Sequence, residues 1–107
     1  MIFLIYNSKM LIKIHKSYRY VIAICDSELL GKKFEQGNLQ LDLTGEFFKG
    51  EEKNEQESLE IIKDAFTEDA SFNIVGKKAT ELALKADIIS KEGIKKIQGV
   101  PFAFVLL

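Results

Sequence analysis

The chain has 107 residues, 47% of them hydrophobic, and a formal net charge of −1. This length suits one domain with a self-sufficient core, and the single cysteine excludes an internal disulfide and a thiolate-rich zinc site. The small net charge excludes a strongly basic or acidic chain, for which electrostatic attraction alone would select the partner.

The first stretch, MIFLIY, is apolar but lacks the basic start and the cleavage site of a signal peptide. No window of the sequence approaches the about 20 apolar residues of a transmembrane helix. We therefore expect one cytoplasmic domain over residues 1–107, with no membrane partner. A complete hairpin is encoded from Met10 onward, so residues 1–9 are expected to be an extension, an added edge strand or a misassigned start.

Three strands are predicted in the first half of the chain. The alternation in MLIKIHK and the continuous apolar run YVIAIC, separated by the polar turn KSYR, predict a hairpin whose second strand is covered on both faces. The stretch GNLQLDL predicts a half-buried third strand. The stretch TGEFFKGEEKN that follows is expected to be a loop, which Phe47 and Phe48 pin to the core.

Two helices and two more strands are predicted in the second half. The first helix, NEQESLEIIKDAF, has Asn54 as its N-cap. The second, GKKATELALKADII, has Val75 in its buried stripe and Asn73 as an upstream cap. A short strand, IKKIQ, and a final apolar strand, FAFVLL, complete an α+β two-layer domain, in which two helices pack on one face of a mostly antiparallel sheet.

Cys25 could be a reactive thiol or a buried structural residue. A nucleophilic cysteine needs a base and a lowered pKa, but the only histidine, His15, is expected several positions away in the hairpin, and the adjacent Asp26 disfavours a thiolate. We expect Cys25 to be structural. No cluster of residues has metal-ligand spacing, and we expect no cofactor.

Two glycine–lysine steps could mark anion sites, Gly31-Lys32-Lys33 and Gly76-Lys77-Lys78. The second step opens a predicted helix, where free N–H groups attract anions, but the glycine and the Ser/Thr of a P-loop are missing. The alternative to a weak anion site is that Gly76 relieves a backbone constraint and the lysines are solvated. The first step is expected to be surface loop.

The charge is segregated along the chain. Residues 1–33 have a net charge of +4, residues 34–70 of −8 and residues 71–107 of +3. This layout is typical of an acidic helix surface, or of a protein with one basic face for a polyanion. In the second case six lysines from three segments would form an RNA-binding surface: Lys32, Lys33, Lys77, Lys78, Lys95 and Lys96.

Three stretches carry a family resemblance: ICDSELLGKKFEQGNLQLDL, FNIVGKKATELA and IQGVPFAF. They resemble a small archaeal family catalogued only as a domain of unknown function (number four-two-four), over about Met10 to Leu107. The resemblance implies an α+β domain and supplies no activity. Family members usually have histidine where this chain has Phe102. The matching positions suggest a functional loop formed by Cys25, Asp26, Gly31, Asn73, Gly99, Val100 and Pro101.

Three classes of function remain open from the sequence. The first is a non-catalytic binding or adaptor protein whose partner is RNA or a protein of the translation apparatus. The second is an enzyme of unrecognised type that uses the loop around Cys25, Asp26 and Gly99–Phe102. The third is a structural subunit, with a homodimer formed through the apolar chain ends, because the final strand would be buried by a second copy if its outer face were not covered.

Overall fold

The computed structural model describes residues 9–106. These residues form eight strands, two α-helices and two short 3-10 helices. Their order is β1 (Met10–Lys16), β2 (Tyr20–Asp26), η1 (Ser27–Leu29), β3 (Lys33–Gln36), β4 (Leu39–Asp42), β5 (Glu51–Lys53), α1 (Glu55–Thr67), β6 (Ser71–Val75), α2 (Lys77–Lys85), η2 (Lys91–Gly93), β7 (Lys95–Ile97) and β8 (Val100–Val105).

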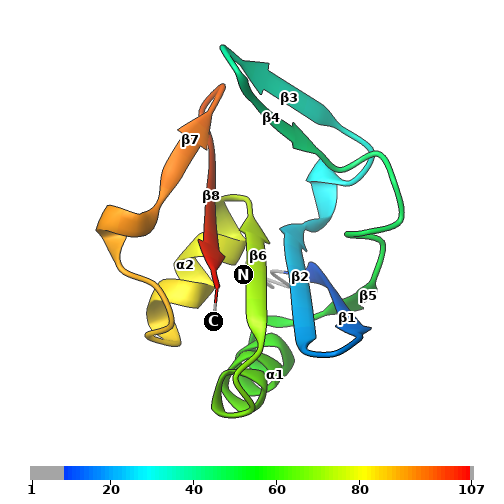
Figure 1. The fold of residues 1–107 in the computed structure, drawn as a ribbon, viewed down its shortest axis with the longest axis vertical. Coiled ribbons are helices and arrows are strands. Elements are labelled where there is room, and N and C mark those ends of the chain that lie inside the picture. The colour runs from blue at the N-terminus through cyan, green and yellow to red at the C-terminus, as the bar shows by residue number, and fades with distance from the viewer. Residues whose placement is uncertain (1–8, 107) are drawn as a thin grey trace, which may run out of the picture.

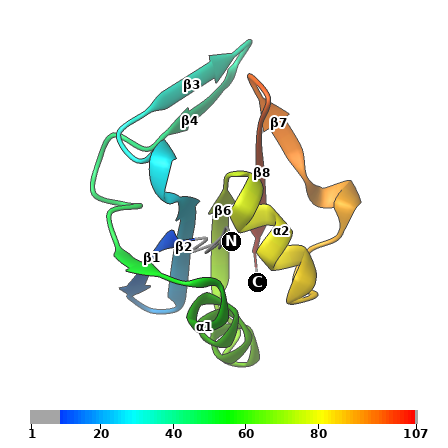
Figure 2. The ribbon, with the colours of Figure 1, turned by 180° about the vertical axis from the view of Figure 1, so that it is seen from behind.

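Six of the strands form one sheet in the order β5-β1-β2-β6-β8-β7, and β3 pairs only with β4. All pairs are antiparallel except β2 with β6. Figure 2 shows both helices on the near side of the sheet, whereas Figure 1 looks onto the opposite face. The predicted class, α+β with two helices on one face of a mostly antiparallel sheet, is confirmed.

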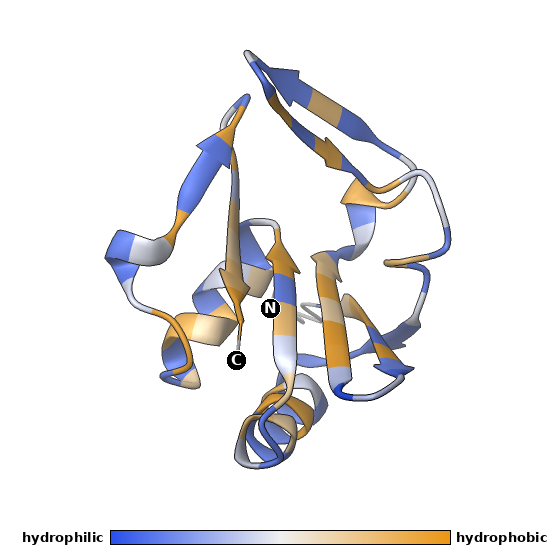
Figure 3. Cartoon of the chain, in the orientation of Figure 1, coloured by the Kyte–Doolittle hydropathy of each residue, from blue (hydrophilic) through white to orange (hydrophobic). Residues whose placement is uncertain are grey.

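The sheet has a buried layer on each side because its side chains alternate between the two faces. On the helix side, Ile24 and Phe72 of the central strands pack with Ile62 of α1 and Leu82 of α2. On the other side, a second cluster lies where the β3–β4 hairpin covers the sheet, and it contains Ala23, Cys25, Leu41, Leu43, Phe48, Val75, Ile97 and Phe102. Figure 3 shows apolar residues along β2 and β8 and mainly hydrophilic residues on β3 and β7.

The β3–β4 and β7–β8 hairpins meet at their turns. The backbone N–H of Gln98 donates to Oε1 of Gln36 at 2.8 Å, and Nε2 of Gln98 donates to the carbonyl oxygen of Glu35 at 2.8 Å. This contact joins segments more than 60 residues apart at the upper end of the molecule in Figure 1. It holds the small hairpin over one half of the sheet, so the other half of this face is left without the hairpin.

Several local predictions are confirmed. The hairpin has the predicted strands, the β7 segment is a strand, and Asn54 caps α1 in a capping box with Glu57. Phe48 is buried in the second cluster, and Phe47 stacks on His15 with ring centroids 4.4 Å apart. The loop that contains both phenylalanines is thus pinned to the sheet as expected.

Other local predictions are wrong. Residues 71–75 form β6, so Asn73 lies within a strand and caps no helix, and Val75 belongs to the sheet. Helix α2 begins after Gly76. Lys33 was expected in a surface loop and begins β3, and Glu51–Lys53 was expected to be loop and forms β5. Tertiary pairing makes these strands, because their own sequences are short and largely charged.

The final strand is covered on both faces only in its first half. Phe102 and Ala103 are buried, whereas Phe104 and Leu106 are exposed to 53% and 78%. The expectation about residues 1–9 lies, for residues 1–8, outside the described part of the chain. Among the described residues, no helix is long and apolar enough to cross a membrane.

Candidate functional site

The start of α2 is capped by a side chain from a distant strand. Asp26 is 4% exposed at the end of β2, and its carboxylate accepts hydrogen bonds from the backbone N–H of Lys78 at 3.1 Å and of Ala79 at 2.8 Å. Gly76 has φ +116°, and a Cβ built on it would overlap the Asp26 carboxylate. The N–H groups expected to attract an external anion are therefore bonded to the protein's own carboxylate.

Burial raises the pKa of Asp26 above the ordinary value of an aspartate, and the nearby Glu28 carboxylate adds to the rise. The hydrogen bonds from Ala79 and Lys78 and the charge of Lys78 oppose the rise without cancelling it. No local sequence pattern predicts this pairing, since Asp26 and Gly76 are separated by a long stretch of chain. The one sequence feature that could have indicated the pairing is Gly76 itself, a glycine placed directly before a predicted helix.

Cys25 is fully buried in the second cluster, and burial, with smaller effects from Asp26 and Glu28, raises its pKa to about 12. In the hairpin register, Cys25 lies opposite Leu11 and His15 lies opposite Val21. The histidine therefore sits four positions further along the ladder, and its Nε2 is 2.9 Å from the carbonyl oxygen of Phe47. An unionised thiol without a neighbouring base is a poor nucleophile.

We predict that Cys25 reacts slowly with a thiol reagent at neutral pH in the folded protein and rapidly in denaturant, because its thiol is buried and not ionised. Cys25→Ala should stay folded, with a loss of about 1–2 kcal/mol in the free energy of unfolding. Absorbance after addition of an aromatic disulfide measures the first rate. Native labelling as fast as in denaturant would contradict the prediction.

The other residues of the expected functional loop are dispersed. Gly99 lies in the β7–β8 turn. Gly31 lies in the turn before β3, where its N–H donates a hydrogen bond to the carbonyl oxygen of Leu43. The carbonyl oxygen of Pro101 accepts from the N–H of Gly76 at 2.8 Å, so this part of the loop does adjoin the start of α2. Val100 packs against the second cluster, and Asn73 lies in β6. None of the cavities described below is lined by Cys25, Asp26 or Gly99.

The six lysines come from three separate parts of the fold. Figures 1 and 2 show β7 and the start of β3 on opposite lateral sides of the molecule, and Lys77 and Lys78 open α2 on the helix side. Neighbours in a strand point to opposite faces, so Lys95 and Lys96 cannot both serve one surface. Lys33 and Lys78 also lie near carboxylates, Lys33 at 3.5 Å from Glu35 and Lys78 at 3.9 Å from Glu28.

An exposed aromatic ring lies on the half of the sheet that neither helices nor hairpin cover. Phe104 of β8 lies opposite Asn73 of β6, which lies opposite Ala23 of β2, so these three side chains share the face without helices. The Phe104 ring is 53% exposed and packs edge-on against Phe102, with centroids 5.6 Å apart at 61°. Asn73 beside it is half-buried.

The charge on this open face is positive. Lys95 lies opposite Phe102 in the β7–β8 ladder, and therefore on the same face as Phe104. Strands β2, β6, β7 and β8 contain one carboxylate, Asp26, which points to the helix side to cap α2. By contrast, α1 carries four of the eleven acidic residues of the segment 34–70: Glu55, Glu57, Glu60 and Asp64. The acidic helix and the open face are thus on opposite sides of the sheet.

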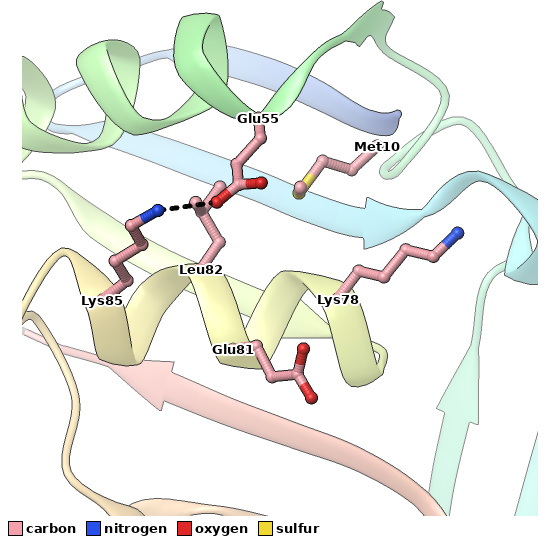
Figure 4. Close-up of a pocket in the computed structure, with 6 residues that line it drawn as sticks. All are labelled: Met10, Glu55, Lys78, Glu81, Leu82 and Lys85. Atoms are coloured by element: carbon pink, nitrogen blue, oxygen red, sulfur yellow. Dashed lines mark hydrogen bonds and ion pairs between the residues drawn. The ribbon is translucent and has the colours of Figure 1, made fainter. Parts of the chain in front are cut away.

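A cavity of about 220 Å³ lies between the two helices, lined by Met10, Glu55, Lys78, Glu81, Leu82 and Lys85. Figure 4 shows the ion pair between Lys85 and Glu55, with Nζ and Oε1 2.9 Å apart, and Lys78 extending away from it. The charges lining this cavity are mixed and partly paired. Among residues 9–106, no three His, Cys, Asp or Glu side chains gather as metal ligands would.

Comparison with known proteins decides the family. Residues 15–107 match the model of the family described as protein of unknown function (DUF424). The chain belongs to this family. A crystal structure of an uncharacterized conserved protein from Methanopyrus kandleri is similar to this DUF424 chain, with a TM-score of 0.81, 24% sequence identity and coverage of 92% of each chain. That likeness establishes the fold. No curated protein matches the chain.

Proposed function

We propose that this DUF424 protein is a non-catalytic binding protein that holds single-stranded RNA on the open half of its sheet. The observation that carries the proposal is the Phe104 ring, half-exposed on a part of the sheet where β2, β6, β7 and β8 present no carboxylate to this face. A buried position would suit a phenylalanine better unless a ligand covers it, because its ring gains by leaving water.

The neighbours of Phe104 suit RNA in particular. Unpaired bases stack on exposed aromatic rings, and such a contact is worth about 1–3 kcal/mol per base. The Asn73 amide offers both donors and an acceptor to a base edge, and Lys95 offers a cation to a phosphate. The acidic α1 helix lies behind the sheet, where it repels a phosphate backbone least.

An enzyme that uses Cys25 fits the geometry less well. Its thiol would have to ionise against a pKa raised to about 12, in a site lined by apolar side chains. A homodimer through the chain ends remains a prediction, and the exposure of Phe104 and Leu106 is compatible with it. The RNA proposal differs because it requires the open face to be accessible in the functional state.

We predict that Phe104→Ala weakens binding of a labelled single-stranded RNA by roughly 10- to 100-fold, because one stacking platform is lost. Fluorescence anisotropy at low salt measures the affinity. The matched control is Phe66→Ala, since Phe66 is similarly exposed, at 40%, but lies on α1 behind the sheet. Equal effects of the two substitutions, or no binding by the unaltered protein at low salt, would refute the proposal.

The two lysines of β7 provide a second matched pair. Lys95 shares the open face with Phe104 and its neighbour Lys96 does not. Lys95→Ala should reduce the slope of log affinity against log salt by about 0.7, the effect of one lost contact to a single-stranded phosphate backbone. Lys96→Ala should leave that slope unchanged. A larger change from Lys96→Ala would move the binding surface to the other side of the sheet.

A further inference from the structure

The outer edge of β1 is only partly paired. Strand β5 pairs with β1 at Met10, Leu11 and Ile12 and ends there, so no strand formed by residues 9–106 pairs with the edge from Lys13 to Lys16. A Cβ built on Gly50 would overlap the carbonyl oxygen of Ile12, which therefore points away from β2 toward this edge. Because backbone groups alternate along a strand, the N–H and C=O of Ile14 point the same way.

A groove follows this free edge and passes between the β1–β2 hairpin and α1. It consists of two adjoining hollows, of about 510 Å³ and 340 Å³, that share Ile14 and Ile61 as lining residues. Ile14 is 49% exposed and Tyr20, at the far end, is 42% exposed. The groove therefore offers apolar side chains together with backbone groups that no described strand pairs, the two features to which an added strand binds.

The two ends of the groove differ in charge, since the larger hollow is lined by Lys13, Lys49 and Lys53 together with Glu51, and the smaller hollow is acidic. The hollow beside Tyr20 is lined by two carboxylates, Asp64 and Glu68 of the α1 end, and by no cation. Among residues 9–106, neither carboxylate is in an ion pair. Lys16 holds its ammonium 6.0 Å from the centre of the Tyr20 ring but is not a lining residue, so its single charge opposes two carboxylates that do line the hollow. This end of the groove therefore favours a cationic ligand group.

We propose that this groove binds an extended peptide segment of a partner protein. The segment pairs with the β1 edge at Ile14 and Lys16, sets alternate apolar side chains over Ile61, and directs a basic side chain toward Asp64 and Glu68. An α-helical ligand would leave the backbone groups of β1 unused. A second copy of this chain fits poorly, because self-pairing about Ile14 would set Lys13 opposite His15 of the other copy.

The test uses short synthetic peptides of alternating valine and threonine that end in arginine or in glutamate, titrated into isotope-labelled protein and followed by NMR. We expect the arginine peptide to shift the amide signals of Ile14, Lys16 and Ile61 at up to about 1 mM, and the glutamate peptide to bind about tenfold more weakly. The double variant Asp64→Lys, Glu68→Lys should reverse this preference.

The matched control is the double variant Glu60→Lys, Glu92→Lys. It changes the net charge equally, at exposed carboxylates that do not line the groove, and should keep the preference for arginine. Unshifted signals at the β1 edge with either peptide, or the same preference in both double variants, would overturn the proposal. It would also fail if deleting residues 1–8 were needed before a peptide could bind.

Discussion

Gly76→Ala is expected to lower the free energy of unfolding by about 4 kcal/mol. Two effects add: a residue with a side chain is strained at φ +116°, at a cost of about 1–3 kcal/mol, and the new methyl group would overlap the Asp26 carboxylate, for which overpacking costs about 1–3 kcal/mol more. The carboxylate cannot simply retreat, because it caps α2. Denaturant unfolding followed by circular dichroism measures the change.

Gly99→Ala separates the two effects. Gly99 also has a positive φ, +79°, but no atom lies within 4 Å of the position that its Cβ would take. In Gly99→Ala only the backbone strain should act, so the free energy of unfolding is expected to fall by about 1–2 kcal/mol. A loss from Gly76→Ala no greater than that from Gly99→Ala would show that the contact with Asp26 is unimportant.

Asp26→Ala is expected to lower the free energy of unfolding by about 2–4 kcal/mol. It removes a helix cap, worth about 0.5–2 kcal/mol, and leaves the N–H groups of Lys78 and Ala79 without their acceptor in a poorly hydrated place. Asp42→Ala is the control, since Asp42 also accepts a backbone hydrogen bond, from Thr44, but is exposed. Equal losses from the two variants, measured by denaturant unfolding, would contradict this account.

The two substitutions should also interact. Once Asp26 is alanine, the methyl group of Gly76→Ala meets no carboxylate, so the double variant should be less destabilised than the sum of the single variants by about 1–2 kcal/mol. Strictly additive losses in the double-mutant cycle would mean that the overlap is relieved elsewhere in the fold.

The raised pKa of Asp26 predicts how the stability of the unaltered protein changes with pH relative to Asp26→Asn. The carboxyl group of the folded protein holds its proton to a higher pH than in the unfolded chain, because burial disfavours the charge. The contribution of this carboxyl group to the free energy of unfolding is therefore complete below the ordinary aspartate pKa. It is lost as the pH rises through the pKa of Asp26 in the folded protein. The stability of the unaltered protein relative to Asp26→Asn should fall over that window, and a rise would contradict the assignment.

The sequence by itself determined the features that depend on neighbouring residues. The alternation from Met10 and the apolar run to Cys25 predicted a hairpin, and Asn54 followed by Glu57 marked the start of α1. The apolar run around Cys25 also predicted its burial, and Cys25 is buried. In each case the physical cause acts over a few residues: the pleat of a strand, or a side chain that reaches a backbone N–H close by.

Only the tertiary structure decided what depends on contacts between distant segments. β6 is a strand because β2 and β8 flank it, although its last residues also fit the start of a helix. Asp26 caps α2 across 52 residues, and no local pattern marks such a partner. Phe104 is exposed because the β3–β4 hairpin covers only the other half of its face. Local sequence sets which residues are apolar, whereas packing against distant segments sets which of them leave water.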